Sequence, residues 1–490
     1  MLYAVNVGRV SRKDKRLQNM NTTIQRKENL PVVTSSSANR VSYIPSRYNV
    51  KVQDEFGQWI IYNSFTGAVG AIPKDKEVDI LPLLKGECLG PLEGEAKILE
   101  QKGFLVKRGI DETRRVSLMK QSRQSAKNLN LILMPTEECN FRCVYCYEAF
   151  ARGQMRPNVR QGVKNLVSHM APKLESLHIS WFGGEPLREM EIVEEISTSL
   201  MNSCRSHGVS YSSNMTTNGY YLSPENLQKL AACEVRNFQI TLDGCPEQHD
   251  AMRVLKGGGA TFDRIWGNLK AARMVQERFS IKIRVNFNQQ TLDQLSPFLS
   301  LLHSELKGDD RFSLFFRPVG NWGGPNDGNF QVCDKKPGEE ASFEASRVAI
   351  GQGLRSEMVY PFLRPHGSVC YAADPKSFVV GADGTLYKCT VALDNENNKV
   401  GRLLPDGTMD LDQDRFALWV TSDDSDDPVC QSCFFRPPCQ GSACPLVRIE
   451  SGQRPCPPEK KMVKRALITV WENFKSFGKL GEAGYQASRD

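Results

Sequence analysis

Three cysteines, Cys139, Cys143 and Cys146, lie in one short segment, PTEECNFRCVYCYEAF, with C-x3-C-x2-C spacing. Three thiolates on one loop can ligate three irons of a cubane iron–sulfur cluster and leave the fourth iron without a protein ligand. That open iron can bind a chelating cofactor. The alternatives are a zinc site or three incidental cysteines, but zinc loops usually combine a C-x2-C pair with a second pair elsewhere. The spacing therefore favours a cluster.

A second group of seven cysteines lies toward the end of the chain, at Cys370, Cys389, Cys430, Cys433, Cys439, Cys444 and Cys456. The last five follow the pattern C-x2-C-x5-C-x4-C, with one more cysteine after a further eleven residues. The alternative to iron–sulfur chemistry here is a structural zinc ribbon built from Cys430, Cys433 and two others. The other cysteines are most simply core or surface thiols, namely Cys88, Cys204, Cys233, Cys245 and Cys333.

Six strand-like runs, separated in several places by helical patterns, must position the first cysteine loop: LNLILMP, SLHISWF, VSYSSNMTTN, RNFQITLD, SIKIRVNF and RFSLFFRP. Repeated βα units predict a parallel sheet with right-handed crossovers. Their spacing suits an open or partial barrel, whose chemistry lies at the carboxyl ends of the strands. Cys139 follows the first of these strands directly, which is where such a barrel would use it.

The rest of the chain divides by composition. The strand-like runs QWIIYN and FLVKRG and the helical patterns VDILPLL and EGEAKILEQKG predict a small α+β unit, and the polar segment DETRRVSLMKQSRQSAKN after them reads as a connector. FVVGADGTLYKC predicts a hairpin that turns at Asp383-Gly384. We therefore expect a flexible tail at 1–39, with translation starting at Met1 or Met20, followed by the α+β unit and linker at 40–125. A barrel at 126–330 and a connector at 331–364 come next. The chain then continues with a Cys-rich unit at 365–460 and an amphipathic helix and tail at 461–490.

Composition excludes several classes of protein. The chain has 490 residues, 40% hydrophobic and 24% charged, which is a globular profile with room for two or three domains. Its net charge of +7 is not gathered into a basic stripe, so nucleic-acid binding has no support. There is no run of eighteen apolar residues and no signal-peptide pattern. We expect a cytoplasmic protein without a membrane partner, whose fifteen cysteines serve metal or redox chemistry rather than disulfides.

The loop with Cys139, Cys143 and Cys146, in which aromatic Tyr145 precedes the last cysteine, resembles the signature of the radical S-adenosylmethionine (SAM) superfamily. The resemblance implies that SAM chelates the open iron of a 4Fe-4S cluster. A one-electron reductant such as flavodoxin or ferredoxin would then cause SAM to be cleaved to methionine and a 5′-deoxyadenosyl radical, which abstracts a substrate hydrogen. The protein supplies binding, orientation and exclusion of side reactions.

Two further segments resemble SAM-binding motifs of that family. WFGGEP ends the second strand with Gly183, Gly184, Glu185 and Pro186, as in the motif that contacts the SAM amino group; the glycines allow close backbone approach, and Glu185 can accept a hydrogen bond from an ammonium. QITLDG and HDAMR place Thr241, Asp243 and Arg253 near the SAM ribose and carboxylate by the same resemblance. For Arg253 the alternative is an ordinary surface ion pair. Arg284 and Asn286 form a further polar pair on one strand face.

The late cysteines, with Cys370-x13-Gly384-x4-Cys389 ahead of the final five, closely resemble the SPASM extension of radical SAM peptide-modifying enzymes. This implies two auxiliary 4Fe-4S clusters and three clusters in all. By the family pattern, one auxiliary cluster takes Cys370, Cys389 and Cys444, and the other Cys430, Cys433, Cys439 and Cys456. Lys376 stands roughly where the family has another cysteine, so the first auxiliary cluster is expected to have an open iron. The x4 gap before Cys444 departs from the commoner x3.

The sequence therefore predicts an α/β enzyme: a partial (β/α)6 radical SAM barrel, with a small winged-helix-like domain before it and a Cys-rich SPASM domain after it. The favoured activity is modification of a ribosomally made peptide by crosslinking or epimerisation, with the small domain binding the leader of a peptide or protein substrate. The first alternative is a sulfatase-maturing enzyme, but Thr390 stands where such enzymes carry a basic Asp. The second is a non-catalytic iron–sulfur or zinc scaffold protein.

Overall fold

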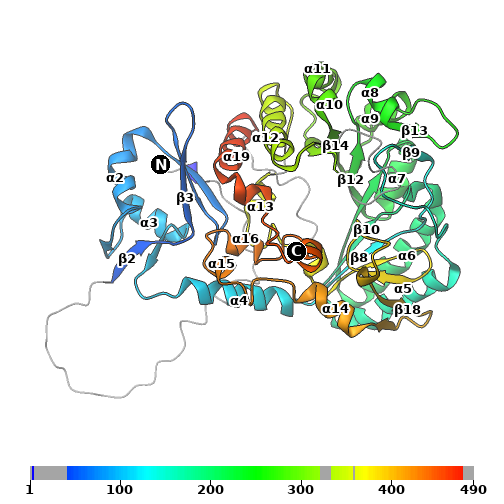
Figure 1. Cartoon of the computed structure of the whole chain (residues 1–490), viewed down its shortest axis with the longest axis horizontal. Helices are drawn as coiled ribbons and strands as arrows, with labels where there is room; N and C mark the ends of the chain where they lie inside the picture. Colours follow the sequence, from blue (N-terminus) through cyan, green and yellow to red (C-terminus); the bar gives the residue numbers. More distant parts are fainter. Residues whose placement is uncertain (1–2, 5–40, 321–332, 357–358, 478–490) are drawn as a thin grey trace. The chain divides into compact units, whose positions relative to one another are not determined.

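The computed structural model describes residues 3–4, 41–320, 333–356 and 359–477. Contacts within the chain divide it into two compact units, residues 1–118 and 119–489 (Figure 1). The predicted tail, apart from Tyr3 and Ala4, lies outside the described residues, as do Met20, the Gly-rich segment 321–328 and the end of the chain from residue 478.

The smaller unit contains two antiparallel sheets. The first has the strand order β1 (Tyr3–Ala4), β5 (Ala68–Ile72), β4 (Trp59–Asn63) and β3 (Asn49–Gln53), and the second the order β6 (Cys88–Leu89), β2 (Ser42–Pro45) and β7 (Leu105–Lys107). Helices α2 (Glu77–Leu83) and α3 (Gly94–Gln101) contribute Ile80 and Leu99 to a core that also contains Ile61 and Phe104. The predicted mixture of strands and helices is present, and its likeness to a winged helix stays a prediction.

One segment that reads as a polar connector is a helix, α4 (Glu112–Ser125). Its start is capped by Asp111, whose Oδ1 accepts hydrogen bonds from the backbone N–H groups of Thr113 and Arg114 at 3.0 and 3.1 Å. Near its other end, Lys376 Nζ donates to the carbonyl of Gln124 at 2.6 Å. The boundary between the two units falls within this helix. Its helical structure was not expected, because the segment is polar on nearly every face and so shows no apolar periodicity.

The larger unit is built on a ten-stranded sheet, in which six parallel strands lie side by side in chain order (Figure 1). Each of the six strand-like runs forms one of them, so the prediction of successive βα units is confirmed. The strands are β8 (Asn128–Leu133), β10 (Ser176–Trp181), β11 (Ser210–Thr217), β12 (Val235–Thr241), β14 (Ser280–Phe287) and β15 (Phe312–Pro318).

The Cys-rich segment extends this same sheet. Strand β16 (Ser377–Val380) pairs in parallel with β8, and it is followed by antiparallel strands β17 (Thr385–Tyr387), β18 (Lys399–Leu403) and β19 (Met409–Leu411). The hairpin between β16 and β17 turns at Asp383-Gly384 as predicted. Gly384 has φ of +90°, which few other residues adopt, and Gly381 N–H donates to the Thr385 carbonyl at 2.9 Å.

Helices connect the parallel strands and bury their apolar faces in one core, which includes Trp181, Phe238 and Phe287. They are α5 (Pro157–Met170), α6 (Met190–His207), α7 (Pro224–Ala232), α8 (Pro246–Met252), α9 (Phe262–Ala272), α10 (Gln289–Asp293) and α11 (Leu295–Leu306). The region expected to be a connector, 331–364, instead holds α12 (Lys335–Gly351) and α13 (Val359–Leu363). Arg347 of α12 forms an ion pair of 2.9 Å with Glu472 of the closing helix α19 (Val463–Phe477).

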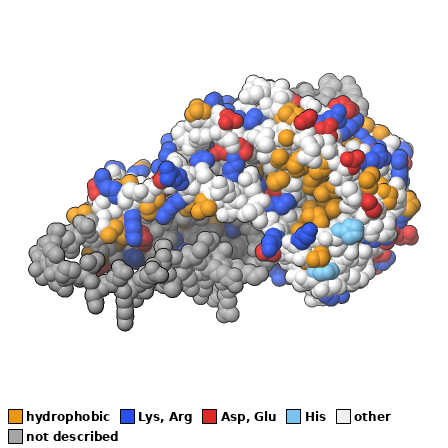
Figure 2. All heavy atoms as spheres, turned by 90° about the horizontal axis from the view of Figure 1, so that it is seen from below, with side chains coloured by type: hydrophobic (Ala, Val, Ile, Leu, Met, Phe, Trp, Pro, Cys, Tyr) orange, Lys and Arg blue, Asp and Glu red, His pale blue; other side chains and the backbone are white. Residues whose placement is uncertain are grey.

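Five short helices lie between β19 and α19: α14 (Gln413–Val420), α15 (Pro428–Gln431), α16 (Arg436–Cys439), α17 (Pro445–Ser451) and α18 (Pro458–Lys461). Two of them contain late cysteines: α15 contains Cys430 and α16 contains Cys439. All fifteen cysteines are among the described residues, and no two of them form a disulfide. In the described part of the chain, no helix is both long and apolar enough to cross a membrane. Figure 2 shows blue basic side chains interspersed with red acidic ones over the described surface of one face.

His178, on β10, gives a pH-dependent contribution to stability that can be tested. Its Nδ1 lies 2.8 Å from Ser212 Oγ and its Nε2 lies 2.8 Å from Asn214 Nδ2. Burial lowers the pKa of His178 to about 4 from its usual 6.5. Between these values the unfolded chain takes up a proton that the folded chain does not, so stability falls as the pH drops from 6.5 toward 4.

We expect the His178→Gln variant to lose about 1 to 2 kcal/mol of that pH dependence between pH 7 and pH 5. Urea unfolding of the full chain and of the variant at the two pH values measures it. An equal loss of stability at pH 5 in both proteins would contradict the assignment.

Candidate functional site

The loop with Cys139, Cys143 and Cys146 leaves the end of β8 and is fixed by a short antiparallel pair of strands. Strand β9 (Phe141–Cys143) pairs with β13 (Arg253–Leu255), and the register places Cys143 opposite Arg253. Phe141 is buried beneath the loop. The pairing therefore joins two segments that the sequence singles out separately, the cysteine loop and the HDAMR segment.

A cavity of about 180 Å³ opens at the carboxyl ends of the strands. Eight residues predicted as ligands of the cluster or of SAM line it together: Cys139, Cys143, Tyr145, Cys146, Gly183, Gly184, Thr241 and Arg253. Three others, Glu185, Pro186 and Asp243, do not line the cavity but are buried beside it. The fold thus brings the candidate residues from four separate segments into one place.

The three cysteines of the loop are close enough to influence one another electrostatically: Cys143 raises the pKa of both Cys139 and Cys146. Burial is the larger cause, and it raises the pKa of each of these two thiols to about 12. Buried thiols of this kind become thiolates when a metal replaces their protons. Within the described residues no three Cys, His, Asp or Glu side chains converge on a single-ion site. Three thiols on one loop are a donor set that can ligate a cubane with one open iron.

Tyr145 is at the centre of a buried polar network. Its hydroxyl donates to Asp243 Oδ2 and accepts hydrogen bonds from Arg253 Nη1 at 2.8 Å and from Asn286 Nδ2 at 3.0 Å. Asp243 Oδ1 accepts from the backbone N–H of Asn286 at 3.0 Å. The network connects the cysteine loop with the ends of β12 and β14, so it orients Tyr145 and Arg253 toward the cavity.

Arg253 is not a residue of a surface ion pair, which was the alternative reading of its position. Its side chain is 6% exposed, and Nε has no hydrogen-bond partner among the described residues. An unsatisfied donor on a buried cation at the wall of a cavity fits an anionic ligand such as a carboxylate. Asp243, by contrast, is already occupied within the network.

Glu185 has protein partners for both of its carboxylate oxygens. Oε1 accepts from the Leu187 N–H at 3.0 Å and from Thr217 Oγ1 at 2.7 Å, and Oε2 accepts from the Asn218 N–H at 2.7 Å. Asn218 Nδ2 in turn donates to Asn140 Oδ1 at 2.8 Å. Glu185 therefore fastens the ends of β10 and β11 to the cysteine loop. A direct contact of Glu185 with a ligand stays a prediction.

Gly183 and Gly184 are required by the packing of the chain against itself. A Cβ on Gly183 would lie 2.2 Å from the carbonyl oxygen of Thr136, and one on Gly184 would lie 2.4 Å from the carbonyl group of Glu138. Real Cβ atoms do not approach backbone atoms so closely. The two glycines thus allow their own backbone to pack closely against the segment that leads into Cys139.

Several cavity residues were not among the predicted ligands. They include Asn218, in the turn Asn218-Gly219 after β11, together with Thr216, Gln239 and Pro318. Glu148, two residues after Cys146, is 9% exposed, and burial, followed by the nearby Glu137, raises its pKa to about 8. A charged residue beside the cysteine motif was a usable signal, but only the fold shows that Glu148 is buried.

Cys370, Cys389 and Cys444 form the first late group. Burial raises the pKa of Cys370, and the nearby Cys389 and Cys444 raise it further. Lys376, which stands near the expected place of a further cysteine, directs its Nζ to backbone carbonyls at the end of α4. It therefore does not reach toward these sulfur atoms.

Lys388, directly before Cys389, is a buried cation that the sequence did not single out. It is 0% exposed, and its Nζ donates to the carbonyls of Asp374 and Ser377 at 2.6 and 2.5 Å. Nζ also lies 4.8 Å from the centre of the Phe378 ring. Burial lowers the pKa of Lys388 to about 7. Lys388 fixes the strand before Cys389 to the loop after Cys370.

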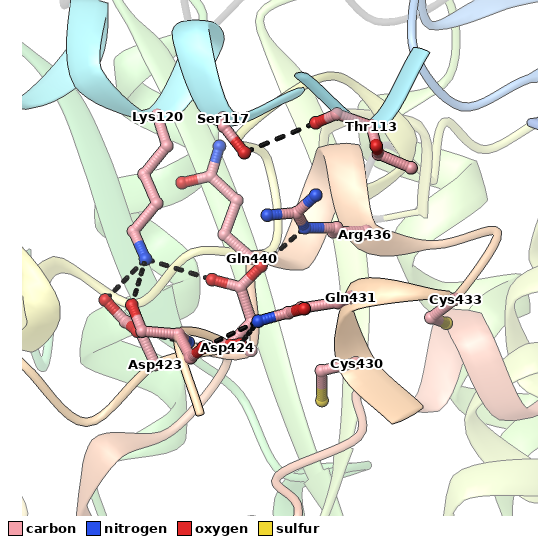
Figure 3. Close-up of polar contacts among 12 residues, drawn as sticks. Thr113, Ser117, Lys120, Asp423, Asp424, Cys430, Gln431, Cys433, Arg436 and Gln440 are labelled. Carbon is pink, nitrogen blue, oxygen red and sulfur yellow. Dashed lines mark hydrogen bonds and ion pairs between the residues drawn. The ribbon is translucent and has the colours of Figure 1, made fainter. Parts of the chain in front are cut away.

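The second late group is held by charged side chains (Figure 3). Lys120 of α4 and Arg436 of α16 both contact the Asp424 carboxylate, at 2.9 and 2.6 Å. Gln431 of α15 donates to the backbone carbonyl of Asp424 at 3.2 Å. These contacts tie down the short segment that carries Cys430 and Cys433.

Cationic groups also contact sulfur atoms of this second group. Arg448 Nη2 lies 3.6 Å from Cys430 Sγ, and Lys460 Nζ lies 3.5 Å from Cys456 Sγ. Cys439 is affected electrostatically by both Cys430 and Cys456. Nearby cations favour thiolates, as cluster ligands must be. The division of the late cysteines into two cluster-binding groups stays a prediction.

Comparisons with known proteins agree with this site. Residues 133–302 match the model of the radical SAM superfamily. The mycofactocin maturase MftC of Mycolicibacterium smegmatis is 30% identical over 172 residues, which cover 34% of this chain and 39% of that protein. A cysteine-type anaerobic sulfatase-maturating enzyme of Clostridium novyi is 24% identical over 344 residues, 65% of this chain and 88% of that protein. The solved structure of native anSMEcpe with bound AdoMet aligns with a TM-score of 0.50 at 16% identity, covering 71% of this chain and 96% of that one.

The chain therefore carries a radical SAM domain, and its α/β fold is that of the superfamily. Its relatives include enzymes, among them a mycofactocin maturase and a cysteine-type anaerobic sulfatase-maturating enzyme. The chain spans only 39% to 55% of the length of the first curated relatives that it matches.

Proposed function

We propose that this protein is a radical SAM enzyme that modifies a ribosomally made peptide by abstracting a hydrogen atom. The observation that carries the proposal is the single cavity at the strand ends, where three cysteines, Gly183, Gly184 and Arg253 meet. In support, MftC is named a maturase, and residues 133–302, which contain most of the residues that line this cavity, match the radical SAM superfamily model. The type of bond formed is left open.

Cys139, Cys143 and Cys146 would hold a 4Fe-4S cluster, which when loaded with SAM and reduced supplies a 5′-deoxyadenosyl radical. The chain's own residues bind and orient the cofactor. Arg253 offers its free Nε to the SAM carboxylate, held in place by Tyr145. The polar side chains of Gln239 and Thr241 line the same wall and can bind ribose hydroxyls.

Replacing Arg253 with Met tests this arrangement, since Met keeps an apolar stem and removes the cation. We expect the Kd for SAM of the reconstituted protein to rise about 10- to 100-fold, because a buried charge-assisted hydrogen bond is lost. Equilibrium dialysis with labelled SAM measures it, and the visible absorbance of the cluster shows whether the site is loaded. An unchanged Kd at equal loading would contradict a role for Arg253 in SAM binding.

The late cysteines would hold two auxiliary 4Fe-4S clusters, one on Cys370, Cys389 and Cys444 and the other on Cys430, Cys433, Cys439 and Cys456. The first group offers three thiolates, and Lys376 is directed elsewhere, so we expect one iron open to a substrate group such as a thiolate. Mössbauer and EPR spectra with and without a thiol-containing peptide test this. Four protein thiolates in both states would overturn the open iron.

The decisive experiment for the activity is formation of 5′-deoxyadenosine by the anaerobically reconstituted protein with dithionite and SAM. Its absence while the cluster remains intact would favour a non-catalytic iron–sulfur scaffold. A short peptide encoded in a neighbouring reading frame is the natural substrate to try. A mass change in that peptide, together with 5′-deoxyadenosine, is the expected result.

A second candidate is sulfatase maturation, favoured by the long match to the Clostridium novyi enzyme. Thr390 weighs against it, because its Oγ1 lies 2.9 Å from the Tyr371 hydroxyl and a hydroxyl pair supplies no carboxylate base. Incubation with a sulfatase-derived peptide containing Cys or Ser separates the two candidates. Formylglycine in the product would make sulfatase maturation the function.

A further inference from the structure

A second cavity, of about 470 Å³, adjoins the one at the strand ends. Tyr147, Glu148 and Phe150, which follow the last cysteine of the loop, line both cavities. The second cavity continues from them to Cys444. It thus connects the proposed place of radical formation with the first group of late cysteines.

The ionisable side chains around this second cavity are mostly acidic. Glu137 is paired with Arg152 at 2.8 Å, and Asp394, which is 74% exposed at the rim, lies 3.7 Å from the same guanidinium. Glu450 accepts a hydrogen bond from Asn395 at 2.8 Å. Of the four carboxyl groups among the lining residues, Glu148 has a pKa raised by burial, and the other three, Glu137, Asp394 and Glu450, still outnumber the one cation, Arg152. The cavity is therefore complementary to a positively charged ligand.

Glu148 is the group in this wall that lacks a partner. Its side chain is buried, and Oε2 has no hydrogen-bond partner among the described residues. A buried carboxyl oxygen left unsatisfied is costly, and in native structures it commonly marks a place where a ligand or ion binds. Arg152, the cation nearby, is already engaged by Glu137.

The remaining lining is apolar. Phe150, Val391, Leu393, Leu446 and Val447 contribute hydrophobic surface to the cavity. A ligand with an aliphatic stem and a positively charged end could contact both the apolar residues and the carboxyl groups of this cavity. The side chains of lysine and arginine have this form.

We propose that the second cavity binds the substrate peptide beside its modified residue and takes up a Lys or Arg side chain whose cation reaches Glu148. This inference rests on the proposed function, since it presumes that a peptide is the substrate. It adds a sequence requirement: a basic residue close to the site of modification.

Measuring peptide affinity in the absence of a reductant, so that no peptide is modified, tests the proposed lysine or arginine site. The reconstituted full-length protein with SAM, but without dithionite, is titrated into fluorescein-labelled peptides that carry one central lysine, norleucine or glutamate in an otherwise identical Ala-Gly frame. Fluorescence anisotropy gives each Kd. We expect the lysine peptide to bind about tenfold or more tightly than the norleucine peptide, and the glutamate peptide to bind most weakly.

The Glu148→Gln variant should reduce the preference for lysine over norleucine to less than about twofold. Glu191→Gln, an exposed change at the start of α6, is the matched control and should keep the preference. Equal affinity for the lysine and norleucine peptides, no saturable binding of either, or an undiminished preference in Glu148→Gln would each overturn the inference. If Glu148→Gln fails to fold, the three peptides on the unaltered protein still decide it. Failure of the proposed function is seen separately, as absence of 5′-deoxyadenosine in the reduced protein.

Discussion

Simultaneous replacement of Cys139, Cys143 and Cys146 with Ala is expected to reduce 5′-deoxyadenosine formation to the background of the assay. The three thiols line one cavity and are the only side chains that the loop offers to a cluster. Without them no iron is left at which SAM could be chelated. Because the site would lose its metal rather than one favourable contact, this is the largest effect expected of any substitution.

Anaerobic reconstitution, followed by chromatographic measurement of 5′-deoxyadenosine and by iron analysis, checks the result. Cys88→Ala is the matched control, since Cys88 lies in the smaller unit on β6 and belongs to neither late group. The late cysteines should still bind iron in the triple variant, which distinguishes a lost site from a failure to fold. SAM cleavage that persists in the triple variant would refute the assignment of the loop.

Gly184→Ala is expected to lower both iron incorporation at the loop and SAM cleavage by at least about tenfold. The added Cβ would meet the carbonyl carbon and oxygen of Glu138, both at 2.4 Å, and a backbone cannot move aside as a side chain can. The segment leading into Cys139 must therefore shift. That shift displaces the first cysteine from its position relative to the other two.

Gly267→Ala is a control glycine substitution that we expect to stabilise the protein rather than disturb the site. Gly267 is exposed in the middle of α9, and a Cβ there would meet nothing within 4 Å. Alanine in place of glycine should stabilise this helix by about 0.5 to 1 kcal/mol and leave SAM cleavage unchanged. Iron content, 5′-deoxyadenosine yield and thermal unfolding are measured for both variants. Wild-type iron content and activity in Gly184→Ala would show that the loop tolerates the displacement.

The sequence predicted those elements whose structure is determined by residues close together in the chain. Most of the six parallel strands were predictable because their apolar residues follow one another or alternate with polar ones, although β11 is mostly polar. The turn at Asp383-Gly384 was predictable because that dipeptide suits a hairpin. Helix α4 was missed because its residues are polar on nearly all sides, and its clearest signal, the cap at Asp111, is a single residue.

Within the site, the motif residues could be named from the sequence, but the contacts that each of them makes could not. Glu185 and Gly184 read as ligand contacts, whereas the structure shows the contacts they make with the chain itself. Those contacts join residues more than thirty positions apart, so no local pattern reports them. The same holds for Glu148 and Lys388, whose burial depends on elements distant in sequence.

The pairing of β16 with β8 has a consequence for how this protein accommodates a substrate. The strand that precedes the first cysteine loop and the strand that precedes Cys389 share one hydrogen-bonded ladder, with Leu133 opposite Val380. The Cys370–Cys389 region therefore cannot swing away as a rigid lid without breaking main-chain hydrogen bonds of the central sheet. The distance between the first cysteine loop and the Cys370–Cys389 region is therefore fixed by the sheet. A substrate that contacts both must have a length and a bend that fit this distance.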